Sequence, residues 1–326
     1  MNDAVLTVRD LSVHYHTDRG ELKAMRRVNM DVPGGSIVGV VGESGCGKST
    51  LISSIIRLLA SNAIIPGGSI TFEGRDLLKL SQDEMRRLRG DRISIVFQDP
   101  MSTLNPVLSI GRQMVDIQYR SRASRADKSK LATEMLASVG ISDPASRLKQ
   151  FPHEFSGGMQ QRISIAMALQ AEPALLIADE PTTALDATLE VQIIHLLKKL
   201  QTDIGCSILF ISHHLGVIAE LCDYVVVMYA GEVVEEGTTR DVFHNPAHPY
   251  TESLLRCDPA SIATKTRSLP TIPGEIPDLV TLPQGCIFKN RCEHVMTQCE
   301  NLVPEWIGSH SGHFVSCHRA AKPGND

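Results

Sequence analysis

The sequence predicts an α/β fold built on a mainly parallel sheet. Over the first 230 residues, short apolar runs rich in β-branched residues alternate with helical stretches, which is typical of a parallel sheet covered by helices. A glycine-rich loop also stands between one such run and a helix. The length of 326 residues allows roughly two domains, and a chain of this size buries a full core without disulfides.

The expected strands are short apolar runs that end near polar or glycine residues, as strands covered on both faces do. They are Ser36–Val41, Ile93–Phe97, Ala174–Ala178, Ser207–Ile211 and Tyr224–Tyr229. Two half-exposed strands, Ser69–Phe72 and Glu232–Glu235, are expected beside turns at 66–68 and 230–231.

Helices are expected after several of these strands, at Lys48–Leu59, Gln82–Leu88 and Ala187–Gln201. Ser81 and Glu84 form a capping box before the second of them. Residues 101–171 favour a helical subdomain. After about Cys257 prolines multiply, and regular structure is not expected there.

Charge and composition exclude several classes of protein. Lys and Arg number 32 against 37 Asp and Glu, a net charge of −5, which excludes a strongly basic surface that binds nucleic acid by charge alone. The N-terminus shows no secretory signal, and no apolar run reaches the length of a membrane-spanning helix. We therefore expect a reducing compartment, where clustered cysteines indicate a metal or redox site rather than disulfides.

A phosphate-binding loop is the clearest motif. The run 42–49 fits G-x-x-x-x-G-K-[ST] between a strand and a helix, the context that the motif requires. Backbone N–H groups of such a loop face the phosphates, a lysine reaches the β- and γ-phosphates, and a hydroxyl ligates Mg²⁺. The expected ATP-binding residues are Gly42, Glu43, Ser44, Gly45, Cys46, Gly47, Lys48, Ser49 and Thr50.

Two carboxylates follow the strand Ala174–Ala178. Asp179, at the end of the strand, is expected to hold Mg²⁺ through water, and Glu180 is placed to polarise the attacking water. Standing alone, such a pair is usually a solvated turn. At this distance after a phosphate loop, it predicts nucleotide hydrolysis.

A further set of motifs resembles the ATPases of ABC transporters over about residues 4–255. The run 155–162, Phe-Ser-Gly-Gly-Met-Gln-Gln-Arg, resembles the signature motif of that family. Gln98 matches the Q-loop, 184–186 (Ala-Leu-Asp) the D-loop, and His213 the switch histidine. Phe155, Met159 and His214 differ from the residues most common at these positions of the family. The departure at His214 puts in doubt the communication between the two ATPase subunits that pair in this family.

The resemblance implies a role for each matching residue. Glu180 and His213 would be catalytic, Mg²⁺ would be held by Ser49, Gln98 and Asp179, and Tyr15 would stack on adenine. The partner subunit's ATP would be capped by Ser156, Gly157, Gly158 and Gln160, with Asp186 in the D-loop.

A narrower resemblance extends over nearly the whole chain. The segments 98–106, 178–186 and 244–251 resemble di- and oligopeptide importer ATPases. This implies ATP and Mg²⁺ as cofactors and three kinds of partner: a second ATPase subunit, two membrane permeases and an extracytoplasmic binding protein. The chain would be peripheral on the cytoplasmic face of the inner membrane. Its fold would be an ABC ATPase core at 1–257, with an antiparallel β subdomain and a helical subdomain at about 101–171, followed by a Cys-rich irregular extension at 258–326. The solute stays open among dipeptides, oligopeptides, nickel chelates and oligosaccharides.

Four cysteines in the extension form a further candidate site. Cys286, Cys292, Cys299 and Cys317 have the spacing C-x₅-C-x₆-C-x₁₇-C, without the paired C-x₂-C of many zinc sites. The spacing resembles the C-terminal motif of dipeptide-importer ATPases, which implies a [4Fe-4S] cluster, a group that Cys₄ ligation suits. Zinc and reduced free thiols stay open as alternatives, and His294, His310, His313 and His318 lie nearby.

Two other functions compete with transport. One is a soluble ABC ATPase that works on nucleic acid or ribosomes, against which stand the single nucleotide domain and the lack of a basic arm. The other is a metal- or redox-sensing protein in which the tail carries the function. Co-purification with membrane subunits separates transport from both.

Overall fold

The computed structural model describes residues 4–99, 103–183, 186–258, 270–308 and 312–320. The motif residues 100–102, 184 and 185, and His310, lie outside the described residues. The chain divides into two compact units, one formed by residues 1–80 and 210–326 and the other by residues 81–209.

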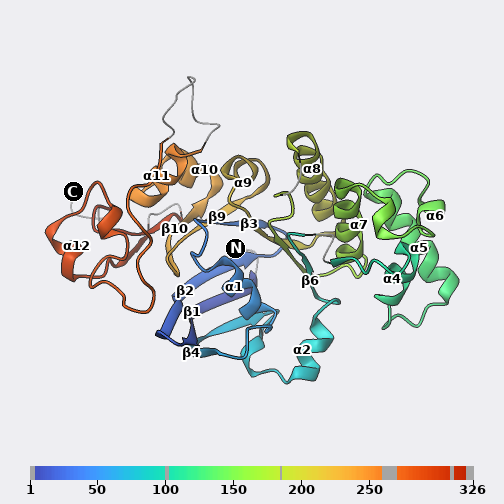
Figure 1. Cartoon of the computed structure of the whole chain (residues 1–326), viewed down its shortest axis with the longest axis horizontal. Coiled ribbons are helices and arrows are strands. Elements are labelled where there is room, and N and C mark those ends of the chain that lie inside the picture. Colours follow the sequence, from blue (N-terminus) through green and yellow to red (C-terminus); the bar gives the residue numbers. More distant parts are fainter. Residues whose placement is uncertain (1–3, 100–102, 184–185, 259–269, 309–311, 321–326) are drawn as a thin grey trace. The chain divides into compact units, whose positions relative to one another are not determined.

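An antiparallel sheet opens the first unit. Strands β1 (Ala4–Thr17) and β2 (Gly20–Pro33) form a hairpin, and β4 (Ala63–Phe72) and β5 (Arg75–Asp76) continue the sheet in the order β2–β1–β4–β5. Figure 1 shows β1, β2 and β4 side by side in blue. The turn predicted at 66–68 is wrong, because β4 runs through these residues and pairs Gly67 with Ser12, where the register shifts.

A second sheet in the same unit carries the phosphate loop. Strand β3 (Ile37–Val41), buried throughout, pairs in parallel with β9 (Tyr224–Tyr229), and β10 (Glu232–Thr238) pairs antiparallel with β9. The extension adds β12 (Phe314–Ser316) and β11 (Trp306–Gly308) beyond β10. The expectation of an irregular extension is therefore wrong in part. Short alternating strands are easily missed in a proline-rich sequence, since three residues carry little periodicity.

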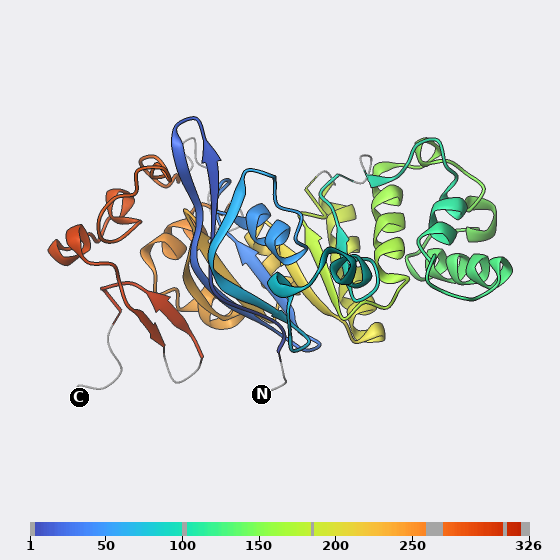
Figure 2. The same cartoon turned by 90° about the horizontal axis from the view of Figure 1, so that it is seen from below.

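The helices of the first unit are short. They are α1 (Lys48–Ile55), α9 (Leu215–Leu221), α10 (Thr239–His244), α11 (Pro249–Arg256) and α12 (Thr297–Asn301), with 3₁₀ turns η1 (Leu77–Lys79) and η4 (Lys289–Arg291). The extension, red in Figures 1 and 2, lies beside the orange helices α10 and α11. Helix α1 ends four residues earlier than predicted.

The second unit contains the other motifs. Strands β6 (Ile93–Val96) and β7 (Leu175–Asp179) pair in parallel, and α2 (Gln82–Leu88) begins with the predicted capping box of Ser81 and Glu84. Helix α8 (Ala187–Ile204) follows, and β8 (Ser207–Ile211) runs from one unit into the other.

The described part of residues 101–171 is mostly helical, as predicted. Its helices are α4 (Ile110–Asp116), α5 (Arg125–Ser138), α6 (Pro144–Arg147) and α7 (Gly157–Leu169), with η2 (Pro152–Glu154), and they form the green cluster in Figure 2. Among the helices of the described residues, none has the length and apolar character needed to cross a membrane.

Candidate functional site

The phosphate loop closes tightly between β3 and α1. Gly42 has φ of 152°, and a Cβ there would lie 2.1 Å from the carbonyl oxygen of Met228 and 2.7 Å from the sulphur of Cys46. Only glycine fits this close approach. Cys46 is 1% exposed and packs inward, where its sulphur accepts a hydrogen bond from the Lys48 ammonium (3.6 Å).

Lys48 lies inside the ring that the loop makes. Its ammonium group is buried and donates hydrogen bonds to the carbonyl oxygens of Gly42 (2.6 Å) and Glu43 (3.1 Å). Ser44, Gly45 and Ser49 are exposed around it. The Tyr15 hydroxyl lies 3.4 Å from that of Thr50, so the predicted adenine-stacking residue stands beside the first turn of α1. The loop thus combines a fixed positive charge with a helix N-terminus, which favours phosphate.

The second unit brings Gln98 and Glu180 together, although they are 82 residues apart. The Gln98 amide donates a hydrogen bond of 3.2 Å to Glu180 Oε2, and the Thr183 hydroxyl donates one of 3.0 Å to the same oxygen. Gln98 follows β6, and Asp179 and Glu180 follow the buried core of β7, its parallel neighbour. Glu180 has φ of 46°, a sparsely populated conformation found often at functional sites.

The signature residues start α7. Ser156 accepts a hydrogen bond from the backbone N–H of Met159 (3.4 Å), and both Ser156 and Gly157 are exposed. A Cβ on Gly157 would meet no described atom within 4 Å, whereas one on Gly158 would lie 2.9 Å from Leu189. The first glycine therefore offers an open backbone, and the second allows α7 to approach α8.

Gln160 is placed differently from its neighbours in this motif. Its side chain is 5% exposed and donates hydrogen bonds to the carbonyl oxygens of Pro152 (3.0 Å) and Phe155 (3.1 Å). It holds the turn before α7 from within the unit.

Asp186 and His213 complete the predicted set. Asp186 Oδ1 accepts from the backbone N–H groups of Thr188 and Leu189, both at 3.0 Å, and so caps α8. His213 is exposed in the first unit, with its ring centre 4.5 Å from that of His214.

The four cysteines of the extension line one small pocket. Its lining also includes His294 and His318, whereas His313 bonds to Glu235 instead (2.7 Å). Its free volume of about 10 Å³ is room for a single water or small ion. Burial, then the neighbouring cysteines, raise the pKa of Cys286 to about 11. As they stand, no three His, Cys, Asp or Glu side chains among the described residues are arranged to hold a metal ion.

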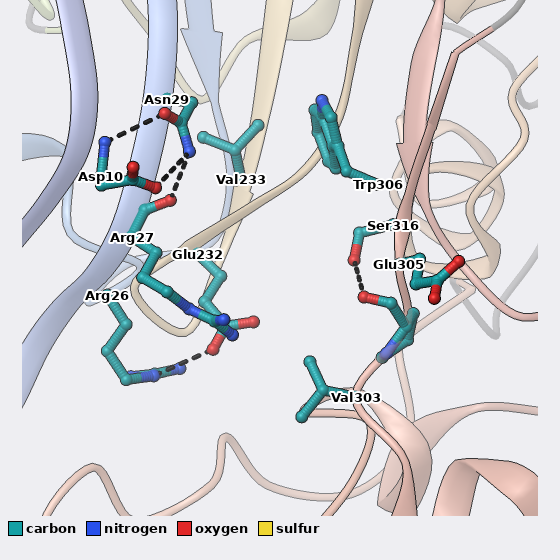
Figure 3. A pocket seen from close by; sticks show the side chains of 11 residues that line it. Asp10, Arg26, Arg27, Asn29, Glu232, Val233, Val303, Glu305, Trp306 and Ser316 are labelled. Atoms are coloured by element: carbon teal, nitrogen blue, oxygen red, sulfur yellow. Dashed lines mark hydrogen bonds and ion pairs between the residues drawn. The ribbon is translucent and has the colours of Figure 1, made fainter.

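Two features of the site were not expected from the sequence. The guanidinium of Arg291 forms an ion pair of 2.7 Å with Glu43 of the phosphate loop, a contact over 248 residues of sequence. A pocket of about 370 Å³ lies between the antiparallel sheet and the extension (Figure 3). Its lining is mixed: charged residues stand beside apolar ones, among them Trp306, and Arg26 pairs with Glu232 at 2.9 Å. No sequence signal marks this pocket.

Three features together define an ATP-binding cassette ATPase. They are a lysine enclosed by a glycine-rich loop, a glutamate after a parallel strand, and a second helix that begins with glycine. The model of the ABC transporter family matches residues 25–183, and that of the oligopeptide/dipeptide transporter C-terminal region matches residues 234–299. The chain belongs to the ABC transporter family, in the branch that carries this C-terminal region.

Relatives and solved structures agree with this assignment. The oligopeptide transport ATP-binding protein OppD of Escherichia coli (strain K12) is 45% identical over 93% of this chain and 89% of its own length. The dipeptide transport ATP-binding protein DppD of Bacillus subtilis (strain 168) is 45% identical over 97% and 94%. The structure of cbiO1 from Clostridium perfringens, part of the transporter complex cbiONQ, is 29% identical over 75% and 92%, with a TM-score of 0.66. The alternative of an ATPase not coupled to transport is not favoured by these relatives.

Proposed function

We propose that this ATPase powers the import of dipeptides or oligopeptides from the cytoplasmic face of the cell membrane. The similarity to peptide transport ATP-binding proteins along most of the chain supports the solute class. The observation that carries the ATPase chemistry is the hydrogen bond from Gln98 to Glu180 at the ends of neighbouring parallel strands.

In the proposed reaction, Lys48 binds the β- and γ-phosphates, and Ser49, Asp179 and Gln98 would hold the Mg²⁺ that neutralises phosphate charge. Glu180 accepts the proton of a water whose oxygen bonds to the γ-phosphorus as the bond to the β–γ bridging oxygen breaks. His213 contacts the γ-phosphate, and Tyr15 stacks on adenine.

We further propose that each ATP is closed over by a second ATPase subunit. The exposed Ser156 and Gly157 suit this role, because their hydroxyl and backbone N–H groups stand at a helix N-terminus. Gln160 stabilises the turn before them through its hydrogen bonds to Pro152 and Phe155. Asp186 lies at the start of α8, in the D-loop. Two permeases and an extracytoplasmic binding protein complete the assembly, and the chain divides into an ATP-binding part, 1–257, and an extension, 258–326.

The four cysteines are proposed to hold a [4Fe-4S] cluster, with zinc as the alternative. Four thiols around one pocket suit either group. The pocket is too small for a cluster as it stands, so the side chains of Cys286, Cys292, Cys299 and Cys317 would have to move apart. Because burial raises the thiol pKa values of three of them, metal binding must release protons.

Co-expression with candidate permease and ATPase partners tests the transport function. We expect the chain to co-purify with two membrane proteins, and the complex to hydrolyse ATP faster when peptide-loaded binding protein is added. Lys48→Ala should lose hydrolysis within the intact complex. A chain that co-purifies with ribosomes or nucleic acid, and with no membrane protein, would contradict the proposal.

A further inference from the structure

Glu43, the second residue of the phosphate loop, is held by hydrogen bonds to three side chains. Glu43 Oε2 accepts a hydrogen bond from Arg291 Nη1 (2.7 Å), and Oε1 accepts one from Nη2 (3.0 Å). Its backbone N–H donates to the Tyr250 hydroxyl (2.9 Å), and its carbonyl oxygen accepts from Lys48 (3.1 Å). The position of Glu43 therefore sets both the loop backbone and an acceptor of the phosphate-binding lysine.

Arg291 has every one of its donor groups engaged. Besides the two bonds to Glu43, Nε donates to the carbonyl oxygen of Pro273 (2.9 Å), Nη2 to that of Ile272 (3.2 Å), and Nη1 to the Tyr229 hydroxyl (3.4 Å). The side chain is 4% exposed. The hydrogen bond to Glu43 raises the pKa of Arg291 above its ordinary value. Such a fork of donors cannot be reproduced by lysine.

The backbone of Arg291 belongs to the segment that forms the cysteine pocket. It lies in η4, directly before Cys292, and its N–H donates to the carbonyl oxygen of Phe288 (3.0 Å). The ring of Phe288, 1% exposed, packs 5.0 Å from that of Tyr229 and 5.4 Å from that of Tyr250. The same packed segment therefore forms part of the cysteine pocket and fixes the position of the Arg291 guanidinium.

The charges of Glu43 and Arg291 affect how tightly the phosphate loop binds a polyphosphate ligand. A carboxylate without a partner beside the phosphate loop would repel the phosphates and cost affinity. Arg291 neutralises Glu43 and fixes it in one place. Both effects depend on the extension, because Arg291 of the extension is the cation that forms the ion pair with the Glu43 carboxylate.

We propose that Arg291 is a positioning residue for ATP, through which the folded extension holds the phosphate loop in its binding conformation. The inference rests on the proposed nucleotide site. Coupling between two sites is reciprocal. A change that loosens the four-cysteine segment should therefore weaken ATP binding, and ATP binding should stabilise that segment.

Equilibrium binding of a fluorescent ATP analogue to the purified full-length complex tests the proposal. Arg291→Met and Arg291→Lys should each weaken binding by about tenfold or more. In Glu43→Gln/Arg291→Met the carboxylate charge is gone, so the part of the loss due to repulsion should be recovered, while the part due to the unfixed loop should persist. Arg319→Met is the matched control, since Arg319 lies two residues after Cys317 of the pocket but pairs with Glu252 (3.0 Å), away from the loop.

Hydrogen exchange of the backbone segment 286–299 gives a second readout that does not depend on turnover. ATP should slow this exchange in the unmodified chain and in Arg319→Met, but not in Arg291→Met. If Arg291→Met fails to fold, Arg291→Lys decides. Unchanged affinity in the Arg291 variants, or an equal loss in Arg319→Met, would overturn the inference. A wild-type chain that binds no ATP would instead overturn the proposed function.

Discussion

Glu180→Gln should remove hydrolysis while leaving ATP bound. The amide has nearly the shape of the carboxylate and keeps an oxygen that accepts from Gln98 (3.2 Å) and Thr183 (3.0 Å), so the local geometry should persist. What is lost is the group that takes the proton of the attacking water. Removing a general base lowers kcat by about 10²- to 10⁴-fold, which corresponds to a barrier higher by about 2.7 to 5.4 kcal/mol.

The assay is phosphate release by the assembled transporter at saturating Mg-ATP, with ATP binding measured on the same preparation. Glu172→Gln is the control, because Glu172 also has a positive φ (48°) and is exposed on the turn before the same strand. Glu172→Gln should hydrolyse ATP at the normal rate. A Glu180→Gln transporter within twofold of the normal rate would refute the assignment of Glu180 as the base.

Four further outcomes are expected. Lys48→Ala should lose tight ATP binding as well as turnover, which equilibrium binding would show. Gly157→Ala should fold normally yet lower the turnover of the assembled transporter, whereas Gly158→Ala should lower the thermal stability of the chain, because only the second added methyl meets Leu189. The hydrogen bond to Glu235 raises the pKa of His313. The contribution of protonated His313 to the free energy of unfolding should therefore be full below about pH 6.5 and be lost as the pH rises through the raised pKa. The urea midpoints of His313→Gln and wild type should therefore converge at high pH. Anaerobically purified chain should absorb broadly in the visible and lose this in Cys292→Ser, whereas colourless protein with one equivalent of zinc would favour the alternative metal.

Local chemistry made much of the nucleotide region predictable. Strand Tyr224–Tyr229 and the capping box of Ser81 and Glu84 appear as predicted, because a continuous apolar run and a side chain that caps a helix act over a few residues. Gln98 and Glu180 were both assigned to the nucleotide site by resemblance, and the structure brings them into contact because they follow neighbouring parallel strands.

Longer-range features were less accessible. Gly67 looks like a turn residue, but tertiary pairing with Ser12 places it in a strand at a register shift. Arg291 carries no motif of its own, and its bond to Glu43 depends on how the extension folds back over 248 residues. Gln160 lies in a recognisable motif, yet its buried side chain bonds to the backbone carbonyl oxygens of Pro152 and Phe155. In each case the outcome is decided by packing that no short window of sequence contains.

The short strands of the extension bear on how this chain avoids aggregation. Pairing of β12 with Glu235 and Glu236 covers the outer edge of β10, and the buried Glu235 accepts hydrogen bonds from His313 and from the backbone N–H groups of Ala247 and His248. An uncovered strand edge is a template for pairing with another chain. A protein cut after Cys257 would expose that edge and leave Glu235 without His313, so self-association that grows with concentration is the expected cost of removing the last fifth of the sequence.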